Sequence, residues 1–231
     1  MGSNSMKVRI RFIEEYLGTA SGDEQLHDSF IASKAPDALT REEEIEALGV
    51  EWEIEKGMTV FARMDDGSTP LTWDYQVRGY FKEVAGALKK ASSRPRFRGW
   101  KVVDGQVTGG DLEMVDKVRS KDIKTHKKAV DNLVFVFPRK IELHLPKGKA
   151  MGDCQRSLRA STAQGERVAL AHSETVPAGT TAEFEVVVLQ DDLMPVVEEW
   201  LDYGYLKGLG QWRNSGKGRF VWERIEDEAT A

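Results

Sequence analysis

The stretch Gly204-Tyr-Leu-Lys-Gly-Leu-Gly-Gln-Trp-Arg-Asn-Ser-Gly-Lys-Gly-Arg-Phe220 is the part of the chain around which the rest is organised. It holds five glycines, interleaved with Lys207, Arg213, Lys217 and Arg219. Glycine permits positive φ and lets a second backbone approach closely. Successive N–H groups in such a loop can form a concave anion site. The stretch predicts an anion-binding loop, and a plain glycine-rich turn is the alternative.

Periodic segments on either side of this loop predict the core. Residues 6–14 alternate polar with apolar side chains, as a strand with one buried face does. Apolar residues within 74–91 recur at intervals of three and four, which indicates an amphipathic helix. A second helix over 192–203 leads into the loop, with Asp191 or Asp192 as its cap. Further strands are predicted near 133–137, 141–145, 167–172, 182–189 and 219–225.

The order of these elements is strand, helix, strands, helix, loop, strand. It predicts an α+β fold with a ferredoxin-like (RRM-like) βαββαβ core and large insertions. Both helices should pack on one face of an antiparallel sheet that contains the first and last strands. The other face is then open, and RRM proteins use that face to bind bases.

The chain is predicted to be one domain over residues 6–226, with insertions at about 17–58 and 101–175. Residues 1–5 have the composition of a cloning remnant, and residues 227–231 belong to an acidic tail. A capping box of Thr40 and Glu43 predicts a polar helix in the first insertion. Residues 101–128 mix glycine with lysine without a clean period, so an irregular excursion is expected there.

Charge is unevenly distributed along the chain. The net charge is −5, yet residues 78–167 contain 21 Lys/Arg against 10 Asp/Glu. The compensating acids cluster at 42–55 and 223–228. Segregated charge can produce a basic face on an acidic protein, which suits nucleic acid as a partner. The alternative is that these cations are scattered over a solvated surface.

Other compositional features narrow the class of protein. Cys154 is the single cysteine, which excludes an internal disulfide framework and a cysteine-based zinc cluster. No apolar run approaches the roughly 18 residues of a membrane helix, so no membrane partner is expected. HExxH, P-loop and DxD-type patterns are missing from the sequence, so neither a cofactor nor a metal is predicted.

Three stretches resemble the RAMP superfamily, the RNA-binding proteins of CRISPR systems. They are the strand at 6–14, the stretch Pro70-Leu-Thr-Trp-Asp-Tyr-Gln-Val-Arg-Gly-Tyr-Phe-Lys82, and the glycine loop. The second departs from the superfamily, which usually carries glycine and serine where this chain has Trp73, Asp74 and Tyr75. The resemblance implies binding of single-stranded RNA through the loop and nearby cations, with DNA as an open alternative. The implied nucleic-acid-binding residues are Gly208, Gly210, Trp212, Arg213, Gly216, Lys217, Gly218, Arg219, Arg78, Lys82, Lys124, Lys127 and Lys128.

The chain as a whole also resembles a group of proteins encoded by bacteriophages and prophages. The shared features are Leu17-Gly-Thr19, Phe135-Val-Phe-Pro-Arg-Lys140 and Gly208-Leu-Gly-Gln-Trp-Arg-Asn214. This likeness implies a phage origin and the cytoplasm of a bacterial host cell. It leaves open a protein–protein module that contacts CRISPR or phage proteins.

An enzymatic alternative depends on the four histidines. Metal-independent RNA cleavage needs a base for the 2′-hydroxyl proton and an acid or cation at the leaving oxygen. His27 follows the first strand, where some RAMP endoribonucleases keep a general base, and His126 lies among lysines. These two residues are the catalytic candidates, while His144 and His172 are read as structural. Isolated histidines are usually structural, which favours binding without cleavage.

Aromatic residues near cations are a further nucleic-acid signal, because bases stack on aromatic rings. The candidates are Trp73, Tyr75, Tyr80, Phe97, Trp100, Trp212 and Phe220. Tyr80 and Phe220 fit the core pattern. Trp212, inside the glycine loop, is the stacking candidate, and anchoring of the loop is its alternative role.

Overall fold

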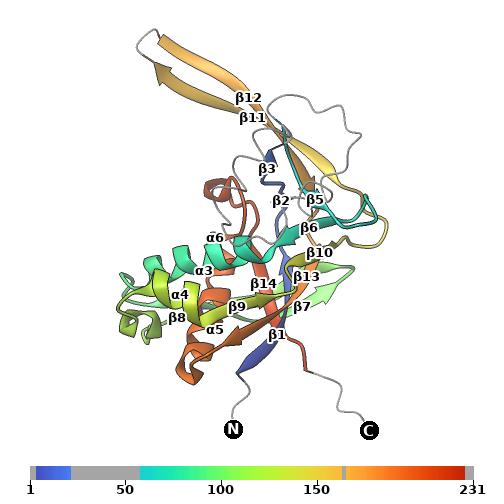
Figure 1. Ribbon diagram of the computed structural model, residues 1–231. Coiled ribbons are helices and arrows are strands. Elements are labelled where there is room, and N and C mark those ends of the chain that lie inside the picture. The colour runs from blue at the N-terminus through green and yellow to red at the C-terminus, as the bar shows by residue number, and fades with distance from the viewer. Residues whose placement is uncertain (1–3, 22–57, 163–164, 227–231) are drawn as a thin grey trace.

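The computed structural model describes residues 4–21, 58–162 and 165–226 (Figure 1). Its first strand, β1 (Ser5–Phe12), buries Met6, Val8, Ile10 and Phe12, each at most 2% exposed. β1 pairs antiparallel with β13 (Thr181–Val188) on one side and with β14 (Phe220–Arg224) on the other. The first and last strands are therefore neighbours, as the sequence predicts.

The two predicted helices pack on the same face of this sheet. Helix α3 (Asp74–Leu88) and helix α5 (Met194–Asp202) lie side by side over it in Figure 1, and their apolar stripes share one core with the inward side chains of β1. Phe81 of α3 contacts Trp200 of α5, with ring centres 5.5 Å apart. Tyr80 and Phe220 are 4% and 2% exposed, which confirms both as core residues.

The order of strands in the main sheet is β14-β1-β13-β10-β6-β5. The second strand of the predicted unit is divided in two: β9 (Val134–Phe137) pairs with residues 185–188 of β13, and β10 (Lys140–His144) pairs with residues 181–182. β6 (Pro70–Trp73) and β5 (Ala62–Arg63) extend the sheet beyond β10. The fold is α+β with a ferredoxin-like core, because the four core strands follow the order last, first, third, second.

The described residues also form a second, five-stranded sheet. The hairpin of β11 (Gly152–Thr162) and β12 (Gly165–Val176) extends away from the core in Figure 1. Near its base, β12 pairs with β2 (Tyr16–Leu17) and β4 (Met58–Val60), and β4 pairs with β3 (Ala20–Ser21). Glu174 of β12 binds Arg63 at 2.6 Å and accepts a hydrogen bond from the Phe61 N–H at 2.8 Å. This buried pair joins the hairpin to the main sheet.

The expected irregular excursion is instead a hairpin and two short helices. β7 (Arg94–Val103) and β8 (Gln106–Val115) pair over almost their full length, followed by η1 (Arg119–Asp122) and α4 (His126–Leu133). Beyond Phe97 most of the hairpin faces solvent, so its side chains carry no apolar alternation. Asp104-Gly105, with φ of 50° and 77°, is a turn signal that identifies this hairpin in the sequence.

Some predictions lie outside the described residues, namely the capped polar helix near 40–55, His27 and the acidic tail. None of the helices in the described ranges is long and apolar enough to cross a membrane.

Candidate nucleic-acid interface

In the glycine loop, two segments of backbone, which we call its two arms, cross in close contact at Leu209 and Gly218. It begins as α6 (Gly204–Lys207), contains η3 (Arg213–Ser215) and leads into β14. The Leu209 N–H donates to the Gly218 carbonyl at 2.9 Å, and the Gly218 N–H donates to the Glu15 carbonyl at 2.7 Å. A methyl group on Gly218 would lie 1.9 Å from the Leu209 oxygen. The glycine is required here by the close approach of the two arms.

Each of the four loop cations has a carboxylate partner. Lys207 and Arg213 bind Glu83 of α3 at 2.8 and 2.5 Å. Lys217 binds Glu15 at 2.5 Å, and Arg219 lies 3.4 Å from Glu14. These pairings leave no signal in the sequence, because each acid is far from its partner along the chain and none belongs to a motif. The loop is thus electrostatically joined to the end of β1 and to α3.

Glu83 remains ionised well into acidic conditions. Burial alone would raise the pKa of its carboxyl, but hydrogen bonds from Arg213 and Lys207 outweigh burial and lower the pKa below its ordinary value. A carboxyl with a lowered pKa keeps its charge until the pH falls through that lowered value. The contact between the loop and α3 is therefore intact at neutral pH.

Trp212 lies at the tip of the loop and is 37% exposed. Its backbone is left-handed, with φ 51° and ψ 34°. The Arg156 guanidinium of β11 lies 5.3 Å from the ring centre and donates to Gln211 at 2.9 Å. Gln211 in turn donates to the Gly18 carbonyl at 2.6 Å. Trp212 is therefore held beside β11 through Arg156 and is also partly exposed to solvent.

A cavity of about 260 Å³ joins the loop to the second RAMP-like stretch. We call it the loop cavity. Trp73 and Tyr75, two of the residues by which that stretch departs from the superfamily, are part of its wall. The cavity is lined by Tyr16, Thr19, Ala20, Val60, Phe61, Ala62, Leu71, Trp73, Tyr75, Gln76, Tyr80, Glu83, Leu209, Gly210 and Arg213. The stretches 70–82 and 204–220, which are about 130 residues apart in the sequence, therefore line the same cavity.

The other predicted cations lie on a different flank of α3. Arg78 and Lys82 both pair with Asp131 of α4, the Arg78 contact being 3.8 Å. Successive helical residues are about 100° apart, so Lys82 points away from the side that Glu83 presents to the loop. Lys124, Lys127 and Lys128 are exposed on and just before α4. The structure thus places the predicted cations in two groups, one at the loop and one at α4.

The histidines are dispersed among the described residues. The His126 ring packs against Gly86 of α3. His144 lies 3.3 Å from Glu142, and His172 lies 3.9 Å from Asp153. No group of three metal-ligating side chains occurs within the described ranges. The candidate catalytic residue His126 thus lies where α4 packs against α3.

The open face of the main sheet carries ion pairs between neighbouring strands. Arg9 of β1 binds Glu183 of β13 at 2.6 Å and Glu223 of β14 at 3.1 Å. Lys7 is opposite Glu185 in the strand register. These pairs alternate in sign across three neighbouring strands. The same face also carries Phe137 of β9, which is opposite Glu185 in the strand register and 52% exposed.

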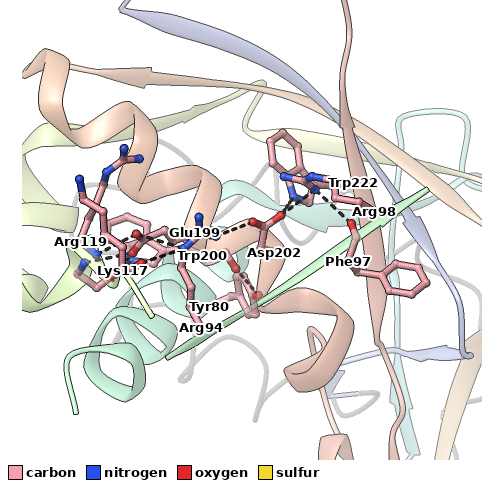
Figure 2. A network of polar contacts seen from close by, with 11 residues as sticks. Tyr80, Arg94, Phe97, Arg98, Lys117, Arg119, Glu199, Trp200, Asp202 and Trp222 are labelled. Carbon is pink, nitrogen blue, oxygen red and sulfur yellow. Dashed lines mark hydrogen bonds and ion pairs between the residues drawn. The ribbon is translucent and has the colours of Figure 1, made fainter. Parts of the chain in front are cut away.

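A buried polar network fixes the helix that leads into the loop (Figure 2). Asp202, at the end of α5, accepts hydrogen bonds from Arg94 at 2.8 Å, from Arg98 at 3.0 Å and from the Trp222 indole at 2.9 Å. One turn earlier, Glu199 accepts from the N–H groups of Arg119 and Ser120. Both acids are buried although neither lies on the apolar stripe of the helix, so the sequence carries no signal for these contacts.

Comparisons with known proteins give distant structural likenesses. No family model matches the chain, and no curated protein matches it. Among solved structures, it is similar to a chain of a Type IV-B CRISPR complex, with a TM-score of 0.44 and 12% identity over 98% of this chain and 92% of that one. It is also similar to a chain in the cryo-EM structure of the Type III-B Cmr-β complex bound to cognate target RNA. There the TM-score is 0.43 and the identity 10%, over 96% of this chain and 58% of that one.

Proposed function

We propose that this protein binds single-stranded RNA in a RAMP-like manner, through the glycine loop and the surface around the loop cavity. The observation that carries the proposal is that the two RAMP-like stretches, 70–82 and 204–220, line the same cavity. A phage or prophage origin and assembly beside CRISPR or phage proteins complete the proposal, on the strength of the sequence resemblances.

The paired state of the loop cations is compatible with RNA binding. Lys207, Arg213, Lys217 and Arg219 retain between 22% and 34% side-chain exposure. Ion pairs at such exposed positions contribute only about 0–1 kcal/mol each. A phosphate offers arginine a stronger, two-pronged contact. An incoming phosphate can therefore exchange with the carboxylates at low cost.

Combined replacement of Arg213, Lys217 and Arg219 by alanine should weaken binding of all single-stranded RNA sequences. Each lost phosphate contact lowers the salt slope of log K by about 0.7, so three contacts would lower it by roughly 2. The measurement is fluorescence anisotropy over a salt series. A matched control replaces the exposed lysines Lys101, Lys147 and Lys149, which removes the same charge away from the loop.

A folded triple variant with the salt slope of the unchanged protein would mean that the loop is only a turn. Folding is checked by circular dichroism. Trp212→Ala separates stacking from charge, because a stacked base contributes about 1–3 kcal/mol and carries no salt dependence of its own. This variant should lose affinity and keep its salt slope.

Glu83→Gln should strengthen RNA binding and steepen its salt dependence. The substitution removes the carboxylate that competes with phosphate for Lys207 and Arg213. The expected gain is at most about fivefold, the equivalent of one surface ion pair. Glu198→Gln is the control, because Glu198 binds Arg224 at 2.8 Å with a similar exposure. Equal or weaker binding by Glu83→Gln would contradict a role for these two cations.

A further inference from the structure

We propose that exposed lysines around η1 and α4 form a second nucleic-acid contact, one that holds the phosphate backbone of a strand or a duplex without touching its bases. We call it the α4 lysine surface, and it consists of Lys117, Lys121, Lys124, Lys127 and Lys128. The proposed function places single-stranded RNA at the glycine loop. The α4 lysine surface goes beyond that function, because it is a separate contact on another flank of α3.

The first observation is that these lysines have no acidic partner. All five are exposed, and within the described ranges none of them forms an ion pair. The four loop cations differ, since each of them binds a carboxylate. The acid of α4, Asp131, is bound instead by Arg78 and Lys82. Residues 117–128 contain six Lys/Arg and a single acid, so this surface carries uncompensated positive charge that attracts anions.

The lysines come from segments that lie side by side. Lys117, just before η1, lines a cavity of about 480 Å³ together with Ala129 and Leu133 of α4. The beginning of the lysine-rich segment is therefore a neighbour of the helix at its end. Asp122 and Asp192 line this cavity as well. The contact that we propose is accordingly made by the exposed lysine side chains around the cavity, and not by the cavity itself.

The lysines do not favour the stability of α4. Lys127 and Lys128 lie in its first turn, Lys124 comes just before it, and the first turn holds no acid. Cations at this end of a helix oppose the helix dipole, and neighbouring like charges repel each other. Acidic residues would stabilise the same turn. A bound polyanion would remove the repulsion between the lysines, so a ligand accounts for an arrangement that stability does not.

The chemistry of the surface suits phosphates and not bases. The stretch 117–133 contains no phenylalanine, tyrosine or tryptophan, so it offers no ring on which a base could stack. Lysine binds phosphate as a point charge. Contacts of this kind do not depend on base sequence, and they are open to duplexes as well as to single strands.

An acidic protein is a poorer fit to this surface. Lysine is depleted at protein–protein interfaces, and the centres of such interfaces are apolar. Among the described residues, the large apolar side chains that are exposed all lie outside 117–133. The stretch therefore presents charge without an apolar centre, which favours a nucleic-acid backbone as the partner.

A duplex separates the α4 lysine surface from the glycine loop, because stacked bases cannot reach Trp212. Binding of a blunt DNA duplex and of single-stranded RNA is measured by fluorescence anisotropy over a salt series. Combined replacement of Lys124, Lys127 and Lys128 by alanine should lower the salt slope of log K for the duplex by roughly 2 to 3, since each phosphate contact on B-DNA accounts for about 0.9. The control that replaces three exposed lysines elsewhere, described with the loop variant, should keep the slope of the unaltered protein.

The loop variant makes the two proposals distinguishable. Replacement of Arg213, Lys217 and Arg219 should lower the slope for single-stranded RNA and leave the slope for the duplex as it is. An unchanged duplex slope in a folded α4 lysine variant, or no duplex binding by the unaltered protein, overturns the α4 lysine surface and leaves the glycine loop standing. An unchanged RNA slope in the loop variant overturns the proposed function alone.

Two further measurements test the partner and the role of the lysines. Polyglutamate is added as a competitor of the duplex at equal total charge. If it displaces the labelled duplex as well as unlabelled duplex does, the surface selects acidic polymers in general and the inference is overturned. The urea midpoint of the α4 lysine variant should equal or exceed that of the unaltered protein, because alanine removes cations from the first turn of α4. A clearly lower midpoint would show that the lysines stabilise the fold, which also overturns the inference.

Discussion

Asp202→Ala is expected to lower the free energy of unfolding by about 3–5 kcal/mol, the usual cost of removing one partner from a buried ion pair. The Asp202 side chain is 2% exposed, and it accepts from Arg94, Arg98 and the Trp222 indole (Figure 2). Alanine would leave these three donors without their shared acceptor. Arg94 is itself only 13% exposed, so water cannot readily replace the carboxylate. Urea denaturation followed by circular dichroism measures the loss.

Two further variants make this result specific. Asp202→Asn keeps an acceptor and removes the charge, so its loss should be smaller than that of alanine. The predicted cap role of Asp191 is wrong, because the residue before α5 is Leu193 and no side chain caps the helix. Asp191→Ala therefore removes only an exposed acid from η2 (Asp191–Leu193) and should stay within about 0.5 kcal/mol of the original. Equal stability of Asp202→Ala and Asp191→Ala would show that the network contributes little. The network matters for function because α5 leads directly into the glycine loop.

Gly218→Ala should disrupt the glycine loop as well as destabilise the protein. Gly218 has φ of 71°, a region that costs an L-residue roughly 1–2 kcal/mol. The added methyl would also lie 1.9 Å from the Leu209 oxygen, a backbone atom that cannot move without breaking the crossing of the two arms. The expected loss of stability therefore exceeds the conformational cost alone, and RNA binding should fall with it.

Gly67→Ala separates the conformational cost of a positive φ from the steric clash with the Leu209 oxygen. Gly67 has nearly the same φ, 69°, but a methyl there would meet no atom within 4 Å. It should show only the conformational cost, and the difference between the two variants then reports the close approach at Gly218. If both variants lose the same stability in urea, the two loop arms are not held as closely as the geometry indicates.

The sequence was sufficient to predict the core because its signals are local. Alternation in β1 and the three-and-four spacing in α3 and α5 follow from the repeat of the backbone itself. The hairpin of β7 and β8 could not be predicted in this way, because a hairpin that is exposed on both faces needs no alternating apolar side chains. Only its Asp104-Gly105 turn is visible as a local signal.

The candidate site could be predicted in part. The loop's glycines and cations stand out in the sequence, as does the stretch 70–82. The acids that bind those cations could not be predicted, because Glu14 and Glu15 are about 200 residues from Lys217 and Arg219, and Glu83 is 130 residues from Arg213. No local repeat encodes such pairings.

The amino-acid sequence by itself determined which segments become the strands and helices of the core, and that a glycine-rich, cationic loop joins α5 to β14. Tertiary structure alone decided that the loop cations pair with carboxylates, that Arg78 and Lys82 turn toward α4, and that Trp73 borders the loop cavity. The physical reason is the distance along the chain over which each kind of interaction acts. Backbone geometry imposes periodicity within a few residues, whereas ion pairs and cavities depend on which surfaces the packed core brings together.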